Sequence, residues 1–324
     1  MTAWILRRLG QAVLVVLAMT VIVFVGVHMI GDPVEMMISP EATAAERAQA
    51  IAALGLDKPL WQQYLYFLWG ALHLNFGNSF AFNEPALRLI LQRMPATMEL
   101  AITAVVLSVL LGIPLGLYAG LRPNSLAGRT IMAGSILGFS LPTFWVGLML
   151  IMLFAVQLGW LPSTGRGHTE LLFGVRWSFL TRDGLAHLLL PAFNLALGNI
   201  ALVLRLTRAG VREHLGMDYV KYARAKGVSE ARVLFVHVMK NILIPIVTVV
   251  GMEFGNVIAF AVVTESIFAW PGMGKLIIDS IGVLDRPVIV AYLMIIVFLF
   301  VLINLVVDLL YTVLDPRVRL ESRE

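Results

Sequence analysis

Residues 99–121 read ELAITAVVLSVLLGIPLGLYAGL, and Glu99, at the first position, carries the one charge in this stretch. About 20 apolar residues of helix are enough to cross the hydrocarbon core of a bilayer. Five other stretches are long and predominantly apolar, namely 11–30, 131–158, 185–206, 242–264 and 288–314. Lipid offers the backbone no hydrogen-bond partner, so such segments satisfy their own N–H and C=O groups as helices. The sequence therefore predicts an all-α membrane protein with six transmembrane helices.

The composition of the whole chain agrees with this class. Of the 324 residues, 59% are hydrophobic and 14% are charged, and the mean hydropathy is +0.87. A soluble domain of this size has too little interior to bury so much apolar surface. The chain has no cysteine, which excludes disulfides, thiolate metal sites and cysteine nucleophiles.

Lys and Arg residues set the expected orientation. They are more than twice as dense in one alternating set of connecting segments (1–10, 122–130, 207–241 and 315–324) as in the other (31–98, 159–184 and 265–287). Basic loops stay on the cytoplasmic side, so we expect the first set, with both termini, to be cytoplasmic. The pI near 9.5 then reflects orientation rather than nucleic-acid binding. Arg7 and Arg8 precede the first apolar run as in a signal peptide, but no small-residue cleavage site follows, so we expect an uncleaved span.

The one sizeable polar insertion, residues 31–98, is predicted to be external and to contain two short helices. Ser39-Pro40-Glu41 offers an N-cap, a proline in the first turn and an acid near the helix dipole, and this helix is expected to end at Leu54-Gly55. Asp57-Lys58-Pro59 starts the second helix, which continues through Leu68. The expected organisation is an N-terminus and first span in 1–30, the insertion in 31–98, a transmembrane core in 99–314 and a cytoplasmic tail in 315–324.

The basic cytoplasmic segment 207–241 contains DYVKYARAKG at positions 218–227. This stretch has helix-forming residues with cations on one side, and Gly227 suits a C-cap because glycine enters the left-handed region without strain. Ser229 is then expected to cap a second short helix that runs through His237. Two short helices at an angle would form a compact knob that can transmit a rigid-body motion from a partner. A solvated basic loop that anchors anionic lipid headgroups is the alternative.

This segment resembles the coupling loop of ABC importer permeases, in the form carried by the peptide and nickel transporters. That form reads Ala-Arg-Ala-Lys-Gly followed by His and Asn, which here are Ala223 to Gly227, His237 and Asn241. Lys221-Tyr222-Ala223 stands where the generic importer motif has Glu-Ala-Ala, and the Ile-x-Leu-Pro of that motif is absent. Other stretches extend the likeness over most of the chain: Leu54–Tyr64, Asn75–Ser79, Met94–Leu100, Thr264–Gly274, Asn304–Asp308 and Asp315–Arg317.

The resemblance implies one of two similar permease subunits that pair around a pathway in the bacterial inner membrane. Two cytoplasmic ABC ATPases, which bind ATP and Mg²⁺, would dock on the coupling loops, and an external solute-binding protein would deliver dipeptides or oligopeptides. Membrane lipid is a further partner, nucleic acid is not, and this chain would carry no cofactor and catalyse no reaction. The implied coupling residues are Asp218, Tyr219, Ala223, Arg224, Ala225, Lys226, Gly227 and Ser229.

The sequence offers no catalytic or metal site. A nucleotide site would need Gly-x-x-x-x-Gly-Lys-Ser/Thr to hold phosphates. At the nearest approach, Gly274-Lys275, Ala269 replaces the upstream glycine and Leu276 replaces the hydroxyl residue. The six histidines show no His-x-x-x-His spacing and are expected on both sides of the membrane.

Four polar residues within the predicted spans are candidates for a solute pathway, because polar groups inside a bilayer are costly and usually face a protein interior or cavity. Glu253 lies midway along the fifth span, and Asn256 shares its helical face three residues later. Asn194 and Asn199 lie in the fourth span. Helix–helix hydrogen bonding is the alternative role. Three others are expected to be packing or gate anchors: Arg205, Asn304 and Asp308.

Three other functions stay open. An importer of the same class could carry nickel chelates, glutathione or another small solute, since delivery proteins choose most of the cargo. A self-contained secondary transporter would work without an ATPase and often contains an inverted repeat, and the sequence shows none. A membrane enzyme would need a clustered acid, base or metal set, and none is visible in the sequence.

Overall fold

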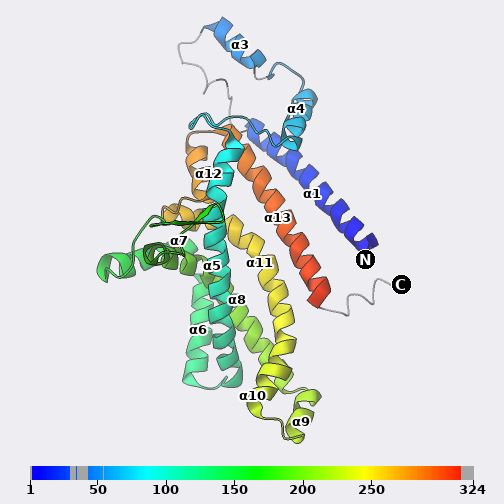
Figure 1. Cartoon of the computed structure of the whole chain (residues 1–324), viewed down its shortest axis with the longest axis vertical. Coiled ribbons are helices and arrows are strands. Elements are labelled where there is room, and N and C mark those ends of the chain that lie inside the picture. Colours follow the sequence, from blue (N-terminus) through cyan, green and yellow to red (C-terminus); the bar gives the residue numbers. More distant parts are fainter. Residues whose placement is uncertain (1, 30–33, 35–42, 54, 315–324) are drawn as a thin grey trace. The chain divides into compact units, whose positions relative to one another are not determined.

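The computed structural model describes residues 2–29, 34, 43–53 and 55–314 (Figure 1). Within these ranges most of the chain is helical, which confirms the expected all-α membrane class. The elements in chain order are α1 (Thr2–Met29), α3 (Ala44–Ala53), α4 (Leu60–Leu72), α5 (Ala86–Leu121), α6 (Leu126–Ser140), α7 (Thr143–Leu150), the π-helical stretch η1 (Ile151–Gln157), β1 (Glu170–Leu172), β2 (Val175–Trp177), α8 (Arg182–Leu215), α9 (Asp218–Ala225), α10 (Glu230–Arg232), the π-helical stretch η2 (Val233–Val238), α11 (Met239–Ile267), α12 (Met273–Gly282) and α13 (Arg286–Leu314).

The elements pack as two compact units. One comprises Met1–Pro95 and Gly272–Leu302, and the other comprises Ala96–Pro271 and Ile303–Glu324. The helices α5 and α13 each contribute residues to both units. Every candidate site residue named above except Asn304 and Asp308 falls in the continuous part of the second unit.

Four helices in the described part of the chain are long and apolar enough to cross a membrane: Ala86–Leu121, Arg182–Leu215, Glu230–Ile267 and Arg286–Asp308. A bent pair of helices makes a fifth span if it is counted as one, and α1 contains a shorter apolar stretch at Gly10–Gly26. These segments fall in the six regions where spans were predicted. The count of six spans itself stays a prediction.

The single span predicted at 131–158 is wrong in its geometry. The chain bends by 110° between Leu126–Ser140 and Thr143–Gln157. The bend lies at Leu141 and Pro142, where Leu141 adopts an extended backbone with ψ of 138°. A proline disfavours the helical conformation of the residue before it and offers no N–H of its own, so α6 ends there. This segment is therefore a broken span or a re-entrant loop.

Two connecting segments contain more structure than expected. The segment 159–184, which was predicted to be external, contains the antiparallel hairpin β1–β2, and the segment 265–287 contains α12. In the insertion, the helix start predicted at Ser39 lies outside the described residues. The helix seen there, α3, follows Thr43, whose hydroxyl accepts from the N–H of Glu46 while the Glu46 carboxylate accepts from the N–H of Thr43. This reciprocal pair is a capping box.

Within the first unit, two contacts organise the insertion. The helices α1 and α4 meet through the hydroxyls of Thr20 and Tyr64, 2.8 Å apart, and through an edge contact between the rings of Phe24 and Tyr64. Farther along, the buried carboxylate of Asp285 accepts hydrogen bonds from the hydroxyl of Ser79 and from the N–H of Phe80 at 3.2 Å. Asp285 thereby fixes the turn that precedes α5.

Within the second unit, α5 packs closely on α8 through glycines at every fourth position. A Cβ placed on Gly112 would lie 2.8 Å from the Val203 side chain, and one on Gly116 would lie 2.5 Å from the Leu204 carbonyl oxygen. Gly120 repeats the pattern one turn later. Small residues at this spacing let membrane helices approach until their backbones touch. The same face of α8 continues to Leu215, so the fourth span extends as a helix into the region predicted to be loop.

Candidate coupling site and pathway residues

The predicted left-handed turn at Gly227 is confirmed. Gly227 has φ of +77°, its N–H donates to the carbonyl of Arg224 at 2.9 Å, and the N–H of Val228 donates to the carbonyl of Ala223 at 3.2 Å. These two bonds form a Schellman motif, which satisfies the last carbonyls of α9. The helix α9 thus ends abruptly, and the chain turns into α10. We call residues 214–241 the knob, and in Figure 1 α9 and α10 lie at the ends of α8 and α11.

Buried side chains attach α9 to the helices around it. Val220 and Ala223 face inward into a cluster that includes Val211 of α8, Val233 of η2 and Ile242 of α11. The opposite face of α9 is exposed, with Tyr222 at 63% and the Lys226 ammonium 4.5 Å from its ring centre. Because apolar contacts hold one face, the other face is presented in a fixed orientation.

An ion pair spans the turn at Gly227. The Nε of Arg224 in α9 lies 2.8 Å from one carboxylate oxygen of Glu230 in α10, and its Nη2 lies 3.0 Å from the other. This bidentate geometry fixes the angle between the two short helices better than a single hydrogen bond would. The hydrogen bonds that Arg224 donates to the Glu230 carboxylate raise the pKa of Arg224. At the start of α9, the Lys221 ammonium lowers the pKa of Asp218 through a 2.8 Å hydrogen bond.

A chain of polar side chains joins three helices at the base of the knob. The hydroxyl of Tyr219 in α9 lies 3.0 Å from Nδ1 of His214 in α8. The amide nitrogen of Asn241 in α11 donates to the same hydroxyl at 3.4 Å and to the His237 carbonyl at 2.8 Å. Asn241 therefore connects α11 to α9, and the His237 carbonyl of η2 orients its amide, contacts that the sequence did not predict.

The predicted coupling residues divide into an inward and an outward set. Ala223 is buried, and the others are exposed: Asp218, Tyr219, Arg224, Ala225, Lys226, Gly227 and Ser229. Ser229 occupies the N-cap position of α10, but its side chain makes no capping hydrogen bond, so that part of the prediction is wrong. The backbone carbonyl of Ser229 accepts from Val233 instead.

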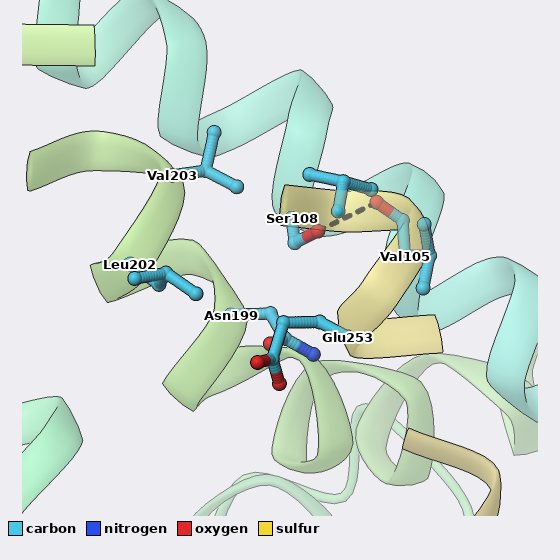
Figure 2. A pocket seen from close by; sticks show the side chains of 7 residues that line it. Val105, Ser108, Asn199, Leu202, Val203 and Glu253 are labelled. Carbon is cyan, nitrogen blue, oxygen red and sulfur yellow. Dashed lines mark hydrogen bonds between the residues drawn. The ribbon is translucent and has the colours of Figure 1, made fainter. Parts of the chain in front are cut away.

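The four polar residues of the spans lie in two places. Glu253 and Asn199 line one small hollow together with residues of α5 (Figure 2), and Asn256 donates to the Glu253 carboxylate at 3.2 Å, as their shared face predicts. Asn194 is fully buried and donates to the Thr264 hydroxyl at 3.1 Å between α8 and α11. Asn194 therefore has the geometry of the helix–helix alternative. The role of all four in a pathway stays a prediction.

A comparison with protein families decides what kind of protein this is. A model described as the binding-protein-dependent transport system inner membrane component matches residues 112–320, and the N-terminal model of the same components matches residues 1–101. The chain belongs to this family. It is a multi-pass permease component of an importer, and the resemblance read from the sequence is confirmed.

Relatives that match the chain over nearly its full length are named as peptide permeases. The chain is 38% identical to the dipeptide transport system permease protein DppB of Escherichia coli strain K12, over 98% of this chain and 99% of the relative. It is 40% identical to the di/tripeptide transport system permease protein DppB of Pseudomonas aeruginosa, with the same coverage. The oligopeptide transport system permease protein AppB of Bacillus subtilis is 38% identical, again over 98% and 99%.

A solved structure shares the fold of this permease. The MetNI methionine ABC transporter in an inward-facing form has a chain that aligns with a TM-score of 0.54 at 16% identity. The alignment covers 70% of this chain and 96% of that one.

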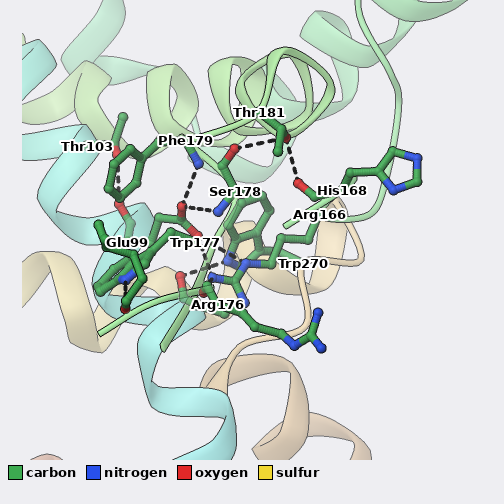
Figure 3. Close-up of polar contacts among 12 residues, drawn as sticks. Glu99, Thr103, Arg166, His168, Arg176, Trp177, Ser178, Phe179, Thr181 and Trp270 are labelled. Atoms are coloured by element: carbon green, nitrogen blue, oxygen red, sulfur yellow. Dashed lines mark hydrogen bonds and ion pairs between the residues drawn. The ribbon is translucent and has the colours of Figure 1, made fainter. Parts of the chain in front are cut away.

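Sequence reasoning missed a buried ionic cluster in the permease (Figure 3). Glu99, at the charged first position of the second predicted span, is 2% exposed. One of its oxygens accepts from Nε and Nη2 of Arg166 at 3.0 and 2.6 Å, and the other accepts from the N–H groups of Ser178 and Phe179 at 2.7 and 2.9 Å. Glu99 thus fixes both ends of the loop that contains the hairpin β1–β2.

Two of the family-like stretches meet beside this cluster. The indole N–H of Trp270 donates to the Ala96 carbonyl at 2.8 Å, and the Thr97 hydroxyl donates to Glu265 at 2.6 Å. The Arg166 guanidinium lies 5.7 Å from the Trp270 ring centre. The stretches at 94–100 and 264–274, which are far apart in sequence, therefore pack against each other.

Proposed function

We propose that this chain is one of two permease subunits of an ATP-driven importer that carries dipeptides or oligopeptides. The peptide cargo is supported by the names of relatives that match the chain almost from end to end. In this proposal the second permease is a homologue that completes the pathway, and an external solute-binding protein delivers the peptide.

The observation that carries the proposal is the knob. Its outer face is exposed while its inner face is buried in the cluster formed by α8, η2 and α11. An ATPase subunit that binds this face can move the transmembrane helices, because the Schellman turn and the Arg224–Glu230 pair hold the two short helices at a fixed angle. ATP and Mg²⁺ belong to two such ATPase subunits, and this chain hydrolyses nothing.

The orientation proposed for the chain places both termini and the knob in the cytoplasm. A single cysteine at Ser229 should react with an impermeant thiol reagent only from the cytoplasmic side, and one at Gln49 only from outside. Both positions are exposed, and the chain has no native cysteine to obscure the result. Equal labelling of the two positions from one side would contradict this orientation.

Reconstitution tests the function as a whole. The permease is purified with its partner permease, the two ATPases and the binding protein, and uptake of a labelled dipeptide into proteoliposomes is measured. We expect uptake and ATP hydrolysis in the full complex and neither in the isolated chain. Uptake that persists without the ATPases would identify a secondary transporter and refute the proposal, as would ATP hydrolysis by the isolated chain.

A further inference from the structure

Glu253 is the middle residue of α11, which runs from Met239 to Ile267. Its carboxylate borders a hollow between α5, α8 and α11 whose empty space, counted with the solvent at its mouth, is about 190 Å³ (Figure 2). The lining residues are Val105, Ser108, Asn199, Leu202, Val203, Val250 and Glu253. The hollow encloses no space for a molecule as large as water, so a peptide group would meet these side chains only at its open mouth.

The polar groups of the hollow have unused hydrogen-bonding capacity. The Ser108 hydroxyl donates to the Val105 carbonyl of its own helix at 2.7 Å. The Glu253 carboxylate accepts one bond, from Asn256. In the described ranges of the chain, no Lys or Arg pairs with Glu253, and the Asn199 amide has no hydrogen-bond partner. Figure 2 shows the side chains of Asn199 and Glu253 among those that line the hollow.

This arrangement suits a monovalent cation with several hydrogens. A carboxylate at mid-membrane depth is costly unless a cation or water faces it. An ammonium group carries three N–H donors, and the carboxylate and the amide oxygen together offer three oxygen acceptors. A divalent metal ion would need about six oxygen ligands, and the described residues contain no group of three acidic or histidine ligands. The chemistry therefore favours an ammonium over a metal.

We propose that Glu253 and Asn199 form a transient site for an ammonium group of the peptide in transit. The ammonium is either the amino terminus or a lysine side chain. This inference rests on the proposed function, since it needs a peptide that passes between the helices. It assigns to Glu253 a direct contact with cargo and to Asn199 the orientation of that contact.

The test uses the reconstituted complex with saturating binding protein and two labelled cargoes, Ala-Ala and Ala-Lys. The Glu253→Gln variant keeps the shape and removes the charge. A charge-assisted hydrogen bond of this kind is worth about tenfold, so we expect uptake to fall about tenfold while ATPase stimulation by loaded binding protein is unchanged. If the site binds the amino terminus, the uptake of both cargoes falls equally. If it binds the lysine side chain, only the uptake of Ala-Lys falls.

A double variant, Glu253→Gln with Asn199→Asp, moves the carboxylate across the hollow from α11 to α8. We expect it to restore most of the lost uptake. Thr248→Val is the matched control, because it removes a hydroxyl of α11 that bonds only to the carbonyl of Ile244 in the same helix. It should transport both cargoes like the wild type.

The outcomes separate the two proposals. If the wild-type complex imports neither peptide, the proposed function fails. If it imports both and Glu253→Gln does so at the same rate, only the ammonium site is refuted. Loss of assembly in Glu253→Gln would show a structural carboxylate, and loss of uptake that Asn199→Asp does not restore would show that Glu253 acts through some other contact. Either result overturns the inference.

Discussion

Replacing Gly227 with valine should uncouple the permease from its ATPases. The backbone at Gly227 is left-handed, with φ of +77°, and a Cβ built there would meet no atom within 4 Å. The cost of a side chain is therefore conformational and not steric. For a residue other than glycine this conformation costs roughly 1–2 kcal/mol, and a β-branched residue lies at the upper end of that range or beyond it.

That cost corresponds to a factor of about 5–30 in the population of the knob geometry. The Schellman turn would open, and the angle between α9 and α10 would be held by the Arg224–Glu230 pair alone. We expect normal membrane insertion, ATPase binding weakened by about this factor, and a matching loss of peptide uptake. Binding is measured by titrating labelled ATPase onto the permease pair in nanodiscs, and uptake is measured in proteoliposomes.

Gly227→Asn is the matched control, because asparagine tolerates the left-handed region. It adds a side chain of similar size to the same exposed surface without the backbone cost, so it should bind the ATPase nearly as well as the wild type. If the Val and Asn variants both bind and transport like the wild type, the turn does not set the docking geometry. If both fail equally, surface contact and not backbone conformation is the cause.

Three further substitutions test the contacts around the sites. Tyr219→Phe removes the hydroxyl that joins three helices, and the loss of this exposed pair of hydrogen bonds costs about 1 kcal/mol of stability. We therefore expect the ATP consumed per imported peptide to rise severalfold; an unchanged ratio would contradict the role of this network. Gly116→Ala forces α5 away from α8 at a cost of about 1–3 kcal/mol, whereas Gly134→Ala, where a Cβ meets nothing within 4 Å, should leave the thermal unfolding midpoint unchanged. Glu99→Gln leaves the mostly buried guanidinium of Arg166 without its charged partner, at a cost of about 3 kcal/mol, and should speed proteolysis within residues 159–181. Cleavage at the wild-type rate would show that Glu99 does not fix the ends of this loop.

The parts of the fold that the sequence predicted are those determined locally. Apolar runs located the helices because hydrophobic length is a property of each segment by itself. The turn at Gly227 was predictable for the same reason, since a glycine after helix-forming residues needs no distant partner. The bend at Pro142 also has a local signal, which the prediction of a continuous span at 131–158 overlooked by weighing apolar length above the effect of proline.

The remaining errors and omissions depend on contacts between distant residues. The extension of α8 to Leu215 is stabilised by packing of Thr207 and Val211 against glycines of α5, which hydropathy does not reveal. Glu99 finds its cation 67 residues away in a polar loop. A charged residue at the end of an apolar run is most simply explained as the edge of a span, so no pattern in the sequence distinguished this buried carboxylate from an exposed one.

The contacts within the second unit suggest which helix moves when an ATPase displaces the knob. The glycine face of α5 lies against the backbone of α8, so Ser108 and Asn199 should keep their separation. The third wall of the hollow, α11, continues through η2 to α10, and Glu253 lies 23 residues beyond Glu230, or about 35 Å at 1.5 Å per residue. Pro245 lies between these two glutamates and removes one helical hydrogen bond.

We therefore infer that α11 moves relative to the α5–α8 pair and carries Glu253 away from Asn199. A peptide ammonium held between them would lose one of its two partners, which would convert a binding site into a release step. Double electron–electron resonance measures the distance between two spin labels. With labels on the exposed positions Val247 of α11 and Leu189 of α8, it should show a distance change on ATP binding by the full complex. A second label pair, on Leu110 of α5 and Leu189, should show none. Equal changes in both pairs would mean that the three helices move as one body, and the release step would then need a different cause.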